Sequence, residues 1–241
     1  CRRVDVDVCA STNDVAAQLA REGAAHGTVV VAQEQTAGRG RMGRRWHSPR
    51  GDSLYLSLVV RPDILPRQVP PITLAAGLAV IDAVNSAGVA ASLKWPNDVL
   101  VGERKLAGIL TEMSTRGERV DHVIVGIGVN LAARAFPPEL AGGATSIALA
   151  GGDVDPAAFE RALLAGLERW LDRFLVGGPP AIADAWTAAA RLGPVRVDDG
   201  ERALVAEAVG LDGDGALIVV DTDGHRHRIT AGDVVLRGQR P

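Results

Sequence analysis

The chain has 241 residues, a formal net charge of −3 and a hydrophobic fraction of 47%. This length is enough for one sizeable domain and a small one, and the near-neutral charge argues against a general nucleic-acid-binding protein. We expect no apolar run of membrane-spanning length and no signal peptide. The two cysteines form no disulfide or metal framework, so the composition predicts a cytoplasmic protein that does not enter the membrane.

The first 192 residues show the periodicities of both strands and helices. Val4, Val6 and Val8 alternate with polar residues, which predicts a half-buried strand, and N-capping side chains then precede a helix that Gly23 ends. The later elements expected are strands at 27–34 and 53–60, a helix at 70–88, strands at 91–95, 104–113 and 121–131, and helices around 159–174 and 180–191.

Gly193 and Pro194 mark the expected domain boundary. Beyond them the pattern changes to short strands separated by Asp-Gly pairs, which are typical of β-hairpins. The strands expected are 202–209, 217–221, 226–230 and 234–237. We therefore expect two domains, at residues 1–192 and 193–241, of which the second is a small β-barrel.

Residues 36–51 form a long basic loop between two expected strands. The loop contains four glycines and no acidic residue. Its five arginines are Arg39, Arg41, Arg44, Arg45 and Arg50. Arginine grips phosphate through a planar fork of donors, and Trp46 offers a flat face for a base. The pattern predicts a nucleotide phosphate-binding loop, and a solvated loop or a nucleic-acid patch is the alternative.

The spacing of Gly38, Gly40 and Gly43 also matches the dinucleotide-binding fingerprint. That fingerprint requires a helix to open at the third glycine, because the helix N-terminus holds the pyrophosphate. Here Arg-Arg-Trp-His-Ser-Pro follows Gly43, and such a run does not start a helix. The Rossmann interpretation is therefore rejected.

Two further groups of polar residues stand out. Ser11, Thr12 and Asn13 lie at an expected strand-to-helix turn, where capping is the default role and binding of a polar ligand headgroup is the alternative. Lys94 and Lys105 are the only lysines among 26 basic residues. They flank the segment Trp-Pro-Asn-Asp98, which either forms a simple turn or places a carboxylate and two ammonium groups near an anionic reaction centre.

In combination these motifs strongly resemble those of biotin–protein ligases. The matching segments, which occur in the family's order, are 11–13, 38–46, 54–57, 94–98, 104–110 and 126–130. The resemblance implies an α+β fold, in which a mixed β-sheet with packed helices resembles the catalytic domain of class II aminoacyl-tRNA synthetases. The expected C-terminal barrel also fits the family.

The resemblance implies a two-step, AMP-forming reaction. Biotin and ATP with Mg²⁺ would give biotinyl-5′-AMP and pyrophosphate, and a lysine of a biotin carboxyl carrier domain, such as that of acetyl-CoA carboxylase, would then take the biotin. The implied biotin-binding residues are Ser11, Thr12, Asn13, Gln35, Gly38, Arg39, Gly40, Arg41 and Lys105. The implied nucleotide-binding residues are Arg41, Arg44, Trp46, Asn130 and Lys105. Lys105, Arg41 and Asp98 are the expected catalytic residues. Asp98 would either orient the incoming amine or support the metal, and no residue is assigned as a metal ligand.

The family also sets expectations for assembly. Some members carry an N-terminal helix-turn-helix that represses transcription, and here we expect the form without it and no nucleic-acid partner, although the chain begins with Cys1. A tendency to dimerise through a sheet edge is implied as well. A lipoate–protein ligase is the nearest enzymatic alternative, and a non-catalytic module that binds nucleotide or nucleic acid is an alternative of another class. The Gly-Arg-Gly-Arg loop with Lys-Trp-Pro-Asn-Asp favours biotin.

Overall fold

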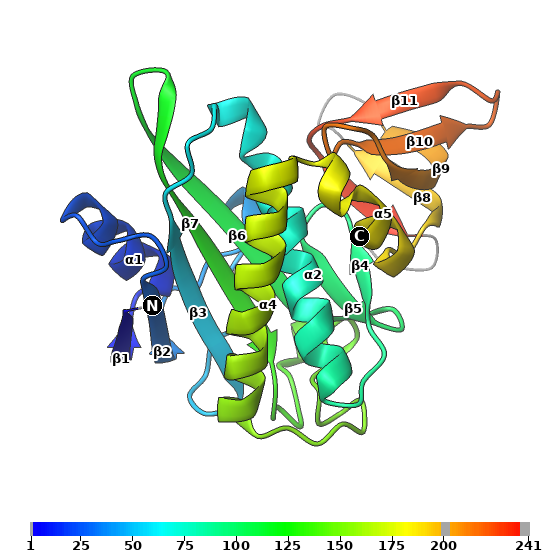
Figure 1. Ribbon diagram of the computed structural model, residues 1–241. Coiled ribbons are helices and arrows are strands. Elements are labelled where there is room, and N and C mark those ends of the chain that lie inside the picture. Colours follow the sequence, from blue (N-terminus) through cyan, green and yellow to red (C-terminus); the bar gives the residue numbers. More distant parts are fainter. Residues whose placement is uncertain (1, 199–202, 237–241) are drawn as a thin grey trace.

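The structure, a computed structural model, describes residues 2–198 and 203–236. Its larger part is built on a seven-stranded sheet with the strand order β1-β2-β3-β7-β6-β5-β4 (Figure 1). The strands are β1 (Arg3–Cys9), β2 (Val29–Gln35), β3 (Ser53–Val60), β4 (Ser92–Lys94), β5 (Asp98–Val101), β6 (Arg104–Arg116) and β7 (Arg119–Asn130). The pair β1–β2 is parallel and the other pairs are antiparallel, so the sheet is mixed, as expected.

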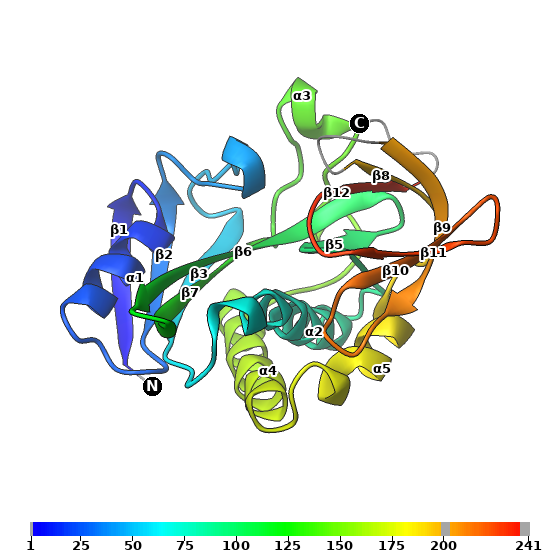
Figure 2. The same cartoon turned by 90° about the horizontal axis from the view of Figure 1, so that it is seen from above.

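Helices cover the two faces of this sheet unequally. α2 (Pro70–Ser86) and α4 (Pro156–Gly177) lie side by side across one face (Figures 1 and 2). α1 (Thr12–Arg21) packs on the opposite face, against β2, β3 and β7. Because side chains alternate along a strand, Val123 and Val125 of β7 join the core under α2 and α4, whereas Ile124 joins the small cluster under α1.

The most apolar helix is a core helix. The short turn η2 (Pro66–Gln68) and α2 together span Pro66–Ser86, 21 residues with a mean hydropathy of 1.4, and 72% of the apolar window is buried inside the protein. By length and composition this segment could cross a membrane, so the expectation that no run reaches that length was wrong. This apolar segment occurs in the sequence because α2 lies between the sheet and α4, where nearly all sides of the helix are buried.

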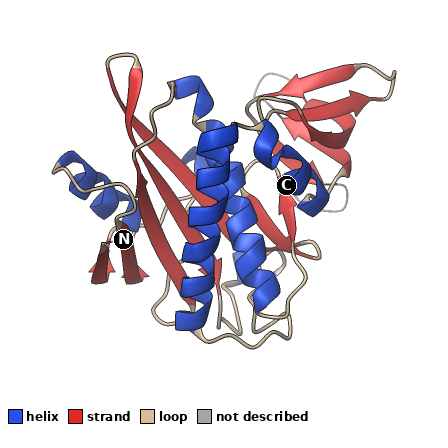
Figure 3. Cartoon of the chain, viewed as in Figure 1, coloured by secondary structure: helices blue, strands red, loops and turns tan. Residues whose placement is uncertain are grey.

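The C-terminal part is an antiparallel sheet apart from the large one, at the upper right of Figure 3. It has five strands in the order β11-β10-β9-β8-β12. Its strands are β8 (Gly193–Asp198), β9 (Ala203–Leu211), β10 (Leu217–Asp221), β11 (Arg226–Ile229) and β12 (Asp233–Leu236). The antiparallel topology agrees with the expectation, but among the described residues β11 and β12 do not pair to close a barrel. Arg202 and Arg237, at the ends of expected strands, lie outside the described residues.

A helix joins the two sheets. α5 (Pro180–Ala189) is followed by residues that run beside β4, where the Arg191 N–H donates to the Leu93 carbonyl oxygen at 2.8 Å. Trp186 of α5 and Leu217 of β10 belong to the same buried core as the large sheet. The two sheets therefore share one continuous apolar core.

Candidate active site

The floor of the site is a strip of the large sheet without side chains. Gly126 and Gly128 of β7 lie on the face opposite α2 and α4, since their neighbours Val125 and Ile127 point into the core under those helices. Gly108 of β6 pairs with Gly128 in register. On this glycine floor, defined as Gly108, Gly126 and Gly128, other groups can approach the backbone closely.

A cluster of buried polar side chains borders the floor at the start of α1. Ser11 is the N-cap and accepts a hydrogen bond from the Asn13 N–H. Asn13 Oδ1 lies 2.6 Å from Ser57 Oγ, and Thr12 donates its N–H to Gln35 Oε1 at 2.8 Å. Gln35 in turn donates to Ser48 Oγ at 3.0 Å. The structure thus brings together the four residues expected at the biotin ureido ring and adds Ser57, which is fully buried.

The arginine loop folds into a small hairpin. Gly40 donates its N–H to the Arg44 carbonyl oxygen at 2.7 Å, and the Trp46 N–H donates to the Gly38 carbonyl oxygen at 2.9 Å. A Cβ on Gly38 would lie 2.5 Å from Ser48 Oγ, which explains why glycine stands there. The only helical turn in the loop is the three-residue η1 (Arg41–Gly43), so no α-helix opens at Gly43, in agreement with rejection of the Rossmann interpretation.

Arg39 faces away from the other loop arginines. Its guanidinium lies 2.6 Å from Asp14 Oδ1 and 2.9 Å from Glu112 Oε2. These contacts, of which the hydrogen bond to Asp14 is the strongest cause, raise the pKa of Arg39. Arg39 therefore ties the loop to α1 and β6.

Arg41 and Arg44 reach the C-terminal sheet. Arg41 donates to Asn97 Oδ1 at 3.3 Å and to the Gly232 carbonyl oxygen at 3.4 Å, and its Nη1 lies 3.7 Å from Asp233 Oδ1. Arg44 forms an ion pair with Asp233. Burial lowers the pKa of Arg41 despite the nearby Asp98 charge. The two cations form a partly desolvated positive site that Asp233 at the start of β12 neutralises.

Trp46 covers the glycine floor. A Cβ on Gly128 would lie 2.5 Å from the indole Cε2 and Nε1, and one on Gly108 would lie 3.1 Å from Cζ3. Lys105 Nζ lies 5.4 Å from the ring centroid. The indole N–H is buried without a hydrogen-bond partner among the described protein atoms, which is unfavourable by about 1–3 kcal/mol. Trp46 thus lies across the surface that a flat ligand would use.

The two lysines flank Asp98. Lys105 Nζ lies 2.6 Å from Asp98 Oδ1, and Lys94 pairs with Asp98 in register across β4 and β5. Burial is the main cause that lowers the pKa of Lys94. The Asp98 charge opposes this shift, and the charges of Lys105 and Arg44 add to it. Residues 95–97 form the turn between β4 and β5, as the turn interpretation expects, but Asp98 opens strand β5 rather than closing that turn.

Asn130 ends β7 on the same face of the sheet. Its Nδ2 donates to the Thr145 carbonyl oxygen at 2.9 Å, and its Oδ1 accepts from Ser53 Oγ at 3.4 Å. The Thr145 N–H donates to the Lys105 carbonyl oxygen at 2.9 Å. Asn130 therefore anchors the segment after β7 beside Lys105.

Sequence reasoning missed three site residues. Glu112 lies two positions beyond the matched segment 104–110, and Asp233 lies in the other domain. Ser57 ends the matched segment 54–57 but was given no role. The alternation of small polar residues in β3 was the one signal present for Ser57. A groove of about 440 Å³ between Gly23, which follows α1, and His122 of β7 contains none of the expected site residues.

Tyr55 fixes the end of the arginine loop, and the ionisation of its phenol tests how deeply Tyr55 is buried. Its hydroxyl donates to the Pro49 carbonyl oxygen at 2.8 Å, and burial raises its pKa to about 12. Because an unfolded tyrosine ionises near pH 10, the stability contributed by the neutral phenol is complete below that pH and is lost as the pH rises through about 12.

We expect the unfolding free energy of Tyr55→Phe, measured in denaturant titrations, to fall less steeply with pH above pH 10 than that of the wild type. Tyr55 is the only tyrosine in the chain, so tyrosinate absorbance of the wild type reports its ionisation directly. A tyrosinate midpoint near pH 10 in the folded protein would contradict the prediction.

Known proteins resemble the chain over nearly its whole length. The family model described as Biotin/lipoate A/B protein ligase family matches residues 6–130, and that of the biotin protein ligase C-terminal domain matches residues 194–237. The chain is 40% identical over 237 residues to the biotin–[acetyl-CoA-carboxylase] ligase of Paracoccus denitrificans, across 95% of this chain and 98% of that protein.

Two further comparisons agree. Identity to the bifunctional ligase/repressor BirA of Bacillus subtilis is 38% over 236 residues, across 95% of this chain and 72% of that protein. The structure superimposes on a biotin protein ligase from Aquifex aeolicus in complex with biotin and ATP with a TM-score of 0.83 and 30% identity, covering 98% of both chains.

Proposed function

The chain belongs to the biotin/lipoate A/B protein ligase family, and from this premise we propose that it is a biotin–[acetyl-CoA-carboxylase] ligase. It activates biotin with ATP to biotinyl-5′-AMP and transfers the biotin to a lysine of a carrier domain. The observation that carries the proposal is the convergence on one glycine floor of a buried polar cluster, an arginine loop and the Lys105–Asp98 pair.

In the first step, a biotin carboxylate oxygen attacks the α-phosphorus of ATP and pyrophosphate leaves. The polar side chains of Thr12, Asn13 and Gln35 hold the ureido ring. The backbone from Gly38 to Arg41 covers the intermediate, and Arg41 and Arg44 exchange Asp233 for phosphate oxygens. Lys105 leaves Asp98 and faces the new carboxyl–phosphate bond, where a fixed cation stabilises the developing charge.

In the second step, the carrier lysine attacks the acyl carbon and AMP leaves. Once Lys105 has turned towards the phosphate, Asp98 is free to orient the incoming ammonium group and accept its proton. The amine must lose a proton to attack, and a carboxylate within reach can take it. The same ion pair thus prepares a cation for the first step and a base for the second.

The proposal includes Mg²⁺ entering with ATP. The carboxylates nearest the phosphate-binding residues are already paired, Asp98 with Lys105 and Asp233 with Arg41 and Arg44. In the proposed order of events these pairs open only when ATP and its ion bind, so phosphate oxygens and water would hold the entering ion. When bound, it neutralises phosphate charge.

We propose a domain boundary immediately before Gly193, where β8 begins. Residues 1–192 form the catalytic domain, and residues 193–241 a smaller domain that supplies Asp233. We place the enzyme in the cytoplasm, with biotin, ATP and the carrier domain as partners. Dimerisation through the edge strand β1 is also part of the proposal, because the other edge strand, β4, is already bonded to Arg191. Sedimentation across a range of concentrations tests it.

A decisive experiment is biotin-dependent ATP–pyrophosphate exchange, followed by transfer to an acetyl-CoA carboxylase carrier domain. We expect exchange with biotin and little with lipoate at equal concentration. Exchange that depends on lipoate would instead support the lipoate ligase. No exchange with either acid, together with nucleotide binding that weakens steeply with salt, would support a non-catalytic module.

Trp46 provides a separate test of the nucleotide site. We expect Trp46→Ala to weaken ATP binding by ~1–3 kcal/mol, because a stacked base loses its partner, and to leave biotin affinity nearly unchanged. Calorimetric titration with each ligand measures both, and the exposed neighbour His47, changed to Ala, is the control. A larger loss for biotin than for ATP would assign the ring to the other ligand.

A further inference from the structure

Glu112 joins two parts of the site that are separate in the sequence. It lies on β6, and each of its carboxylate oxygens has a partner. Oε2 accepts a hydrogen bond from Asn13 Nδ2 at 2.5 Å, and Arg39 Nη2 lies 3.1 Å from Oε1 and 2.9 Å from Oε2. One carboxylate therefore touches both the polar cluster and the arginine loop.

The contact with Asn13 determines which way the buried amide points. An ionised carboxylate only accepts hydrogen bonds, so the amide nitrogen of Asn13 must face Glu112. The amide oxygen then faces Ser57 Oγ, at 2.6 Å, and lies over Gly126, where an added Cβ would be 2.1 Å away. Asn13 Nδ2 also donates to the Leu110 carbonyl oxygen, at the longer distance of 3.4 Å, so removal of Glu112 would leave only this weaker contact to stop the amide from rotating and presenting the wrong group to a ligand.

The contact with Arg39 holds the loop. Arg39 binds Asp14 through Nη1 and Glu112 through Nη2, so both ends of its guanidinium are fixed. A single exposed ion pair contributes little, but two partners on different elements define one position for the Arg39 backbone. That backbone belongs to the segment proposed to cover the intermediate.

We propose that Glu112 is a positioning residue for biotin activation, which orients the Asn13 amide and fixes Arg39 so that the polar cluster and the loop form one biotin site. Glu112 acts through these two residues. This inference rests on the proposed function and adds a role that the matched motifs do not assign.

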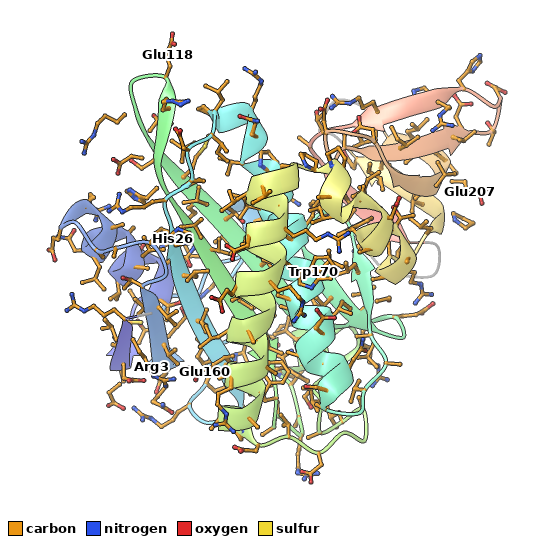
Figure 4. All side chains as sticks on the ribbon, viewed as in Figure 1. Arg3, His26, Glu118, Glu160, Trp170 and Glu207 are labelled. Carbon is orange, nitrogen blue, oxygen red and sulfur yellow. The ribbon has the colours of Figure 1, made fainter. Side chains whose placement is uncertain are left out.

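The test is Glu112→Gln, which keeps the shape but replaces one acceptor oxygen by a donor group. The matched control is Glu118→Gln at the tip of the same β6–β7 hairpin, where the side chain points into solvent (Figure 4). A hydrogen bond to a charged group of this kind corresponds to about a tenfold change in affinity. We expect the KM and the Kd for biotin to rise by that factor in Glu112→Gln, whereas the KM for ATP and turnover at saturating biotin change little.

A double-mutant cycle with Arg39→Gln separates positioning from general destabilisation. If the two residues act together, Arg39→Gln weakens biotin binding less in the Glu112→Gln background than in the wild type. Equal biotin affinity in Glu112→Gln and Glu118→Gln would overturn the inference, as would a parallel decline of all kinetic constants with the melting temperature. A wild type without biotin-dependent exchange would overturn the proposed function instead, and calorimetry with biotin alone would still decide the role of Glu112.

Discussion

Lys105→Ala is expected to slow single-turnover formation of biotinyl-5′-AMP by ~10²–10³-fold, the usual effect of removing a preorganised charge-stabilising donor. The ammonium group is held in advance, 2.6 Å from Asp98 Oδ1 and 5.4 Å from the centroid of the Trp46 ring. No other lysine side chain is paired with Asp98 in the described ranges. The mutation therefore removes the cation nearest the proposed bond-forming centre.

Lys105→Arg is expected to behave almost as badly, because the site fits an ammonium group. The Lys105 Cε and Nζ atoms lie 3.2 and 3.3 Å from the position of a Cβ on Gly108, so the stem runs close to the β6 backbone. A planar guanidinium would be displaced, and a shift of about 1 Å can cost on the order of a hundredfold in rate. Arg104→Ala, on the exposed neighbour, is the control. Near-wild-type rates for Lys105→Arg would mean that charge alone suffices.

Gly126→Ala is expected to lower biotin affinity by about a hundredfold, because the polar cluster must move. The new Cβ would lie 2.1 Å from Asn13 Oδ1 and 2.8 Å from its Cγ. Asn13 is buried and bonded to both Ser57 and Glu112, so it cannot yield without breaking one of these contacts. A displacement of about 1 Å is enough for an effect of this size, and overpacking adds about 1–3 kcal/mol of destabilisation.

The matched control is Gly142→Ala, where an added Cβ has no atom within 4 Å. Neither glycine has the positive φ that would strain an alanine, so the pair isolates the steric effect. Calorimetric titration with biotin measures the affinity, and thermal melting reports stability. An unchanged biotin affinity in Gly126→Ala would place the ligand away from Asn13.

Local sequence patterns predicted most elements of the large sheet. β3 was expected at its observed bounds, since its alternation of leucines with small polar residues reflects one buried core face. The patterns failed where pairing overrides local preference. Pro96 and Asn97 favour a turn and do lie in one, but the turn preference of Asp98 gave way to strand β5, because Asp98 pairs with Lys94 and Gly108 on either side. β8 was missed because Gly193 and Pro194 favour a boundary, although they pair with Ala208 and Glu207 of β9.

Site residues could be predicted where the local sequence segment is itself unusual. Lys105 and the polar turn at Ser11 could be identified because they lie in short, unusual segments. Glu112 and Asp233 could not be identified in this way, because their partners are distant in the sequence. Glu112 binds Asn13, 99 positions away, and Asp233 of the C-terminal sheet binds Arg44. A surface carboxylate has no distinctive local signal, so only the folded structure shows what it holds.

The contact between the arginine loop and β12 has a consequence for the timing of synthesis. Arg41 and the Gly232 carbonyl oxygen that it binds are 191 positions apart in the chain. At ordinary translation speeds, the ribosome needs about 10 to 40 seconds to cover that distance. During this interval the loop has emerged but lacks its C-terminal partners, and its two cations are free to meet any phosphate in the cell. A nascent chain therefore passes through a period in which the proposed nucleotide site is open, before Asp233 is synthesised and pairs with its arginines.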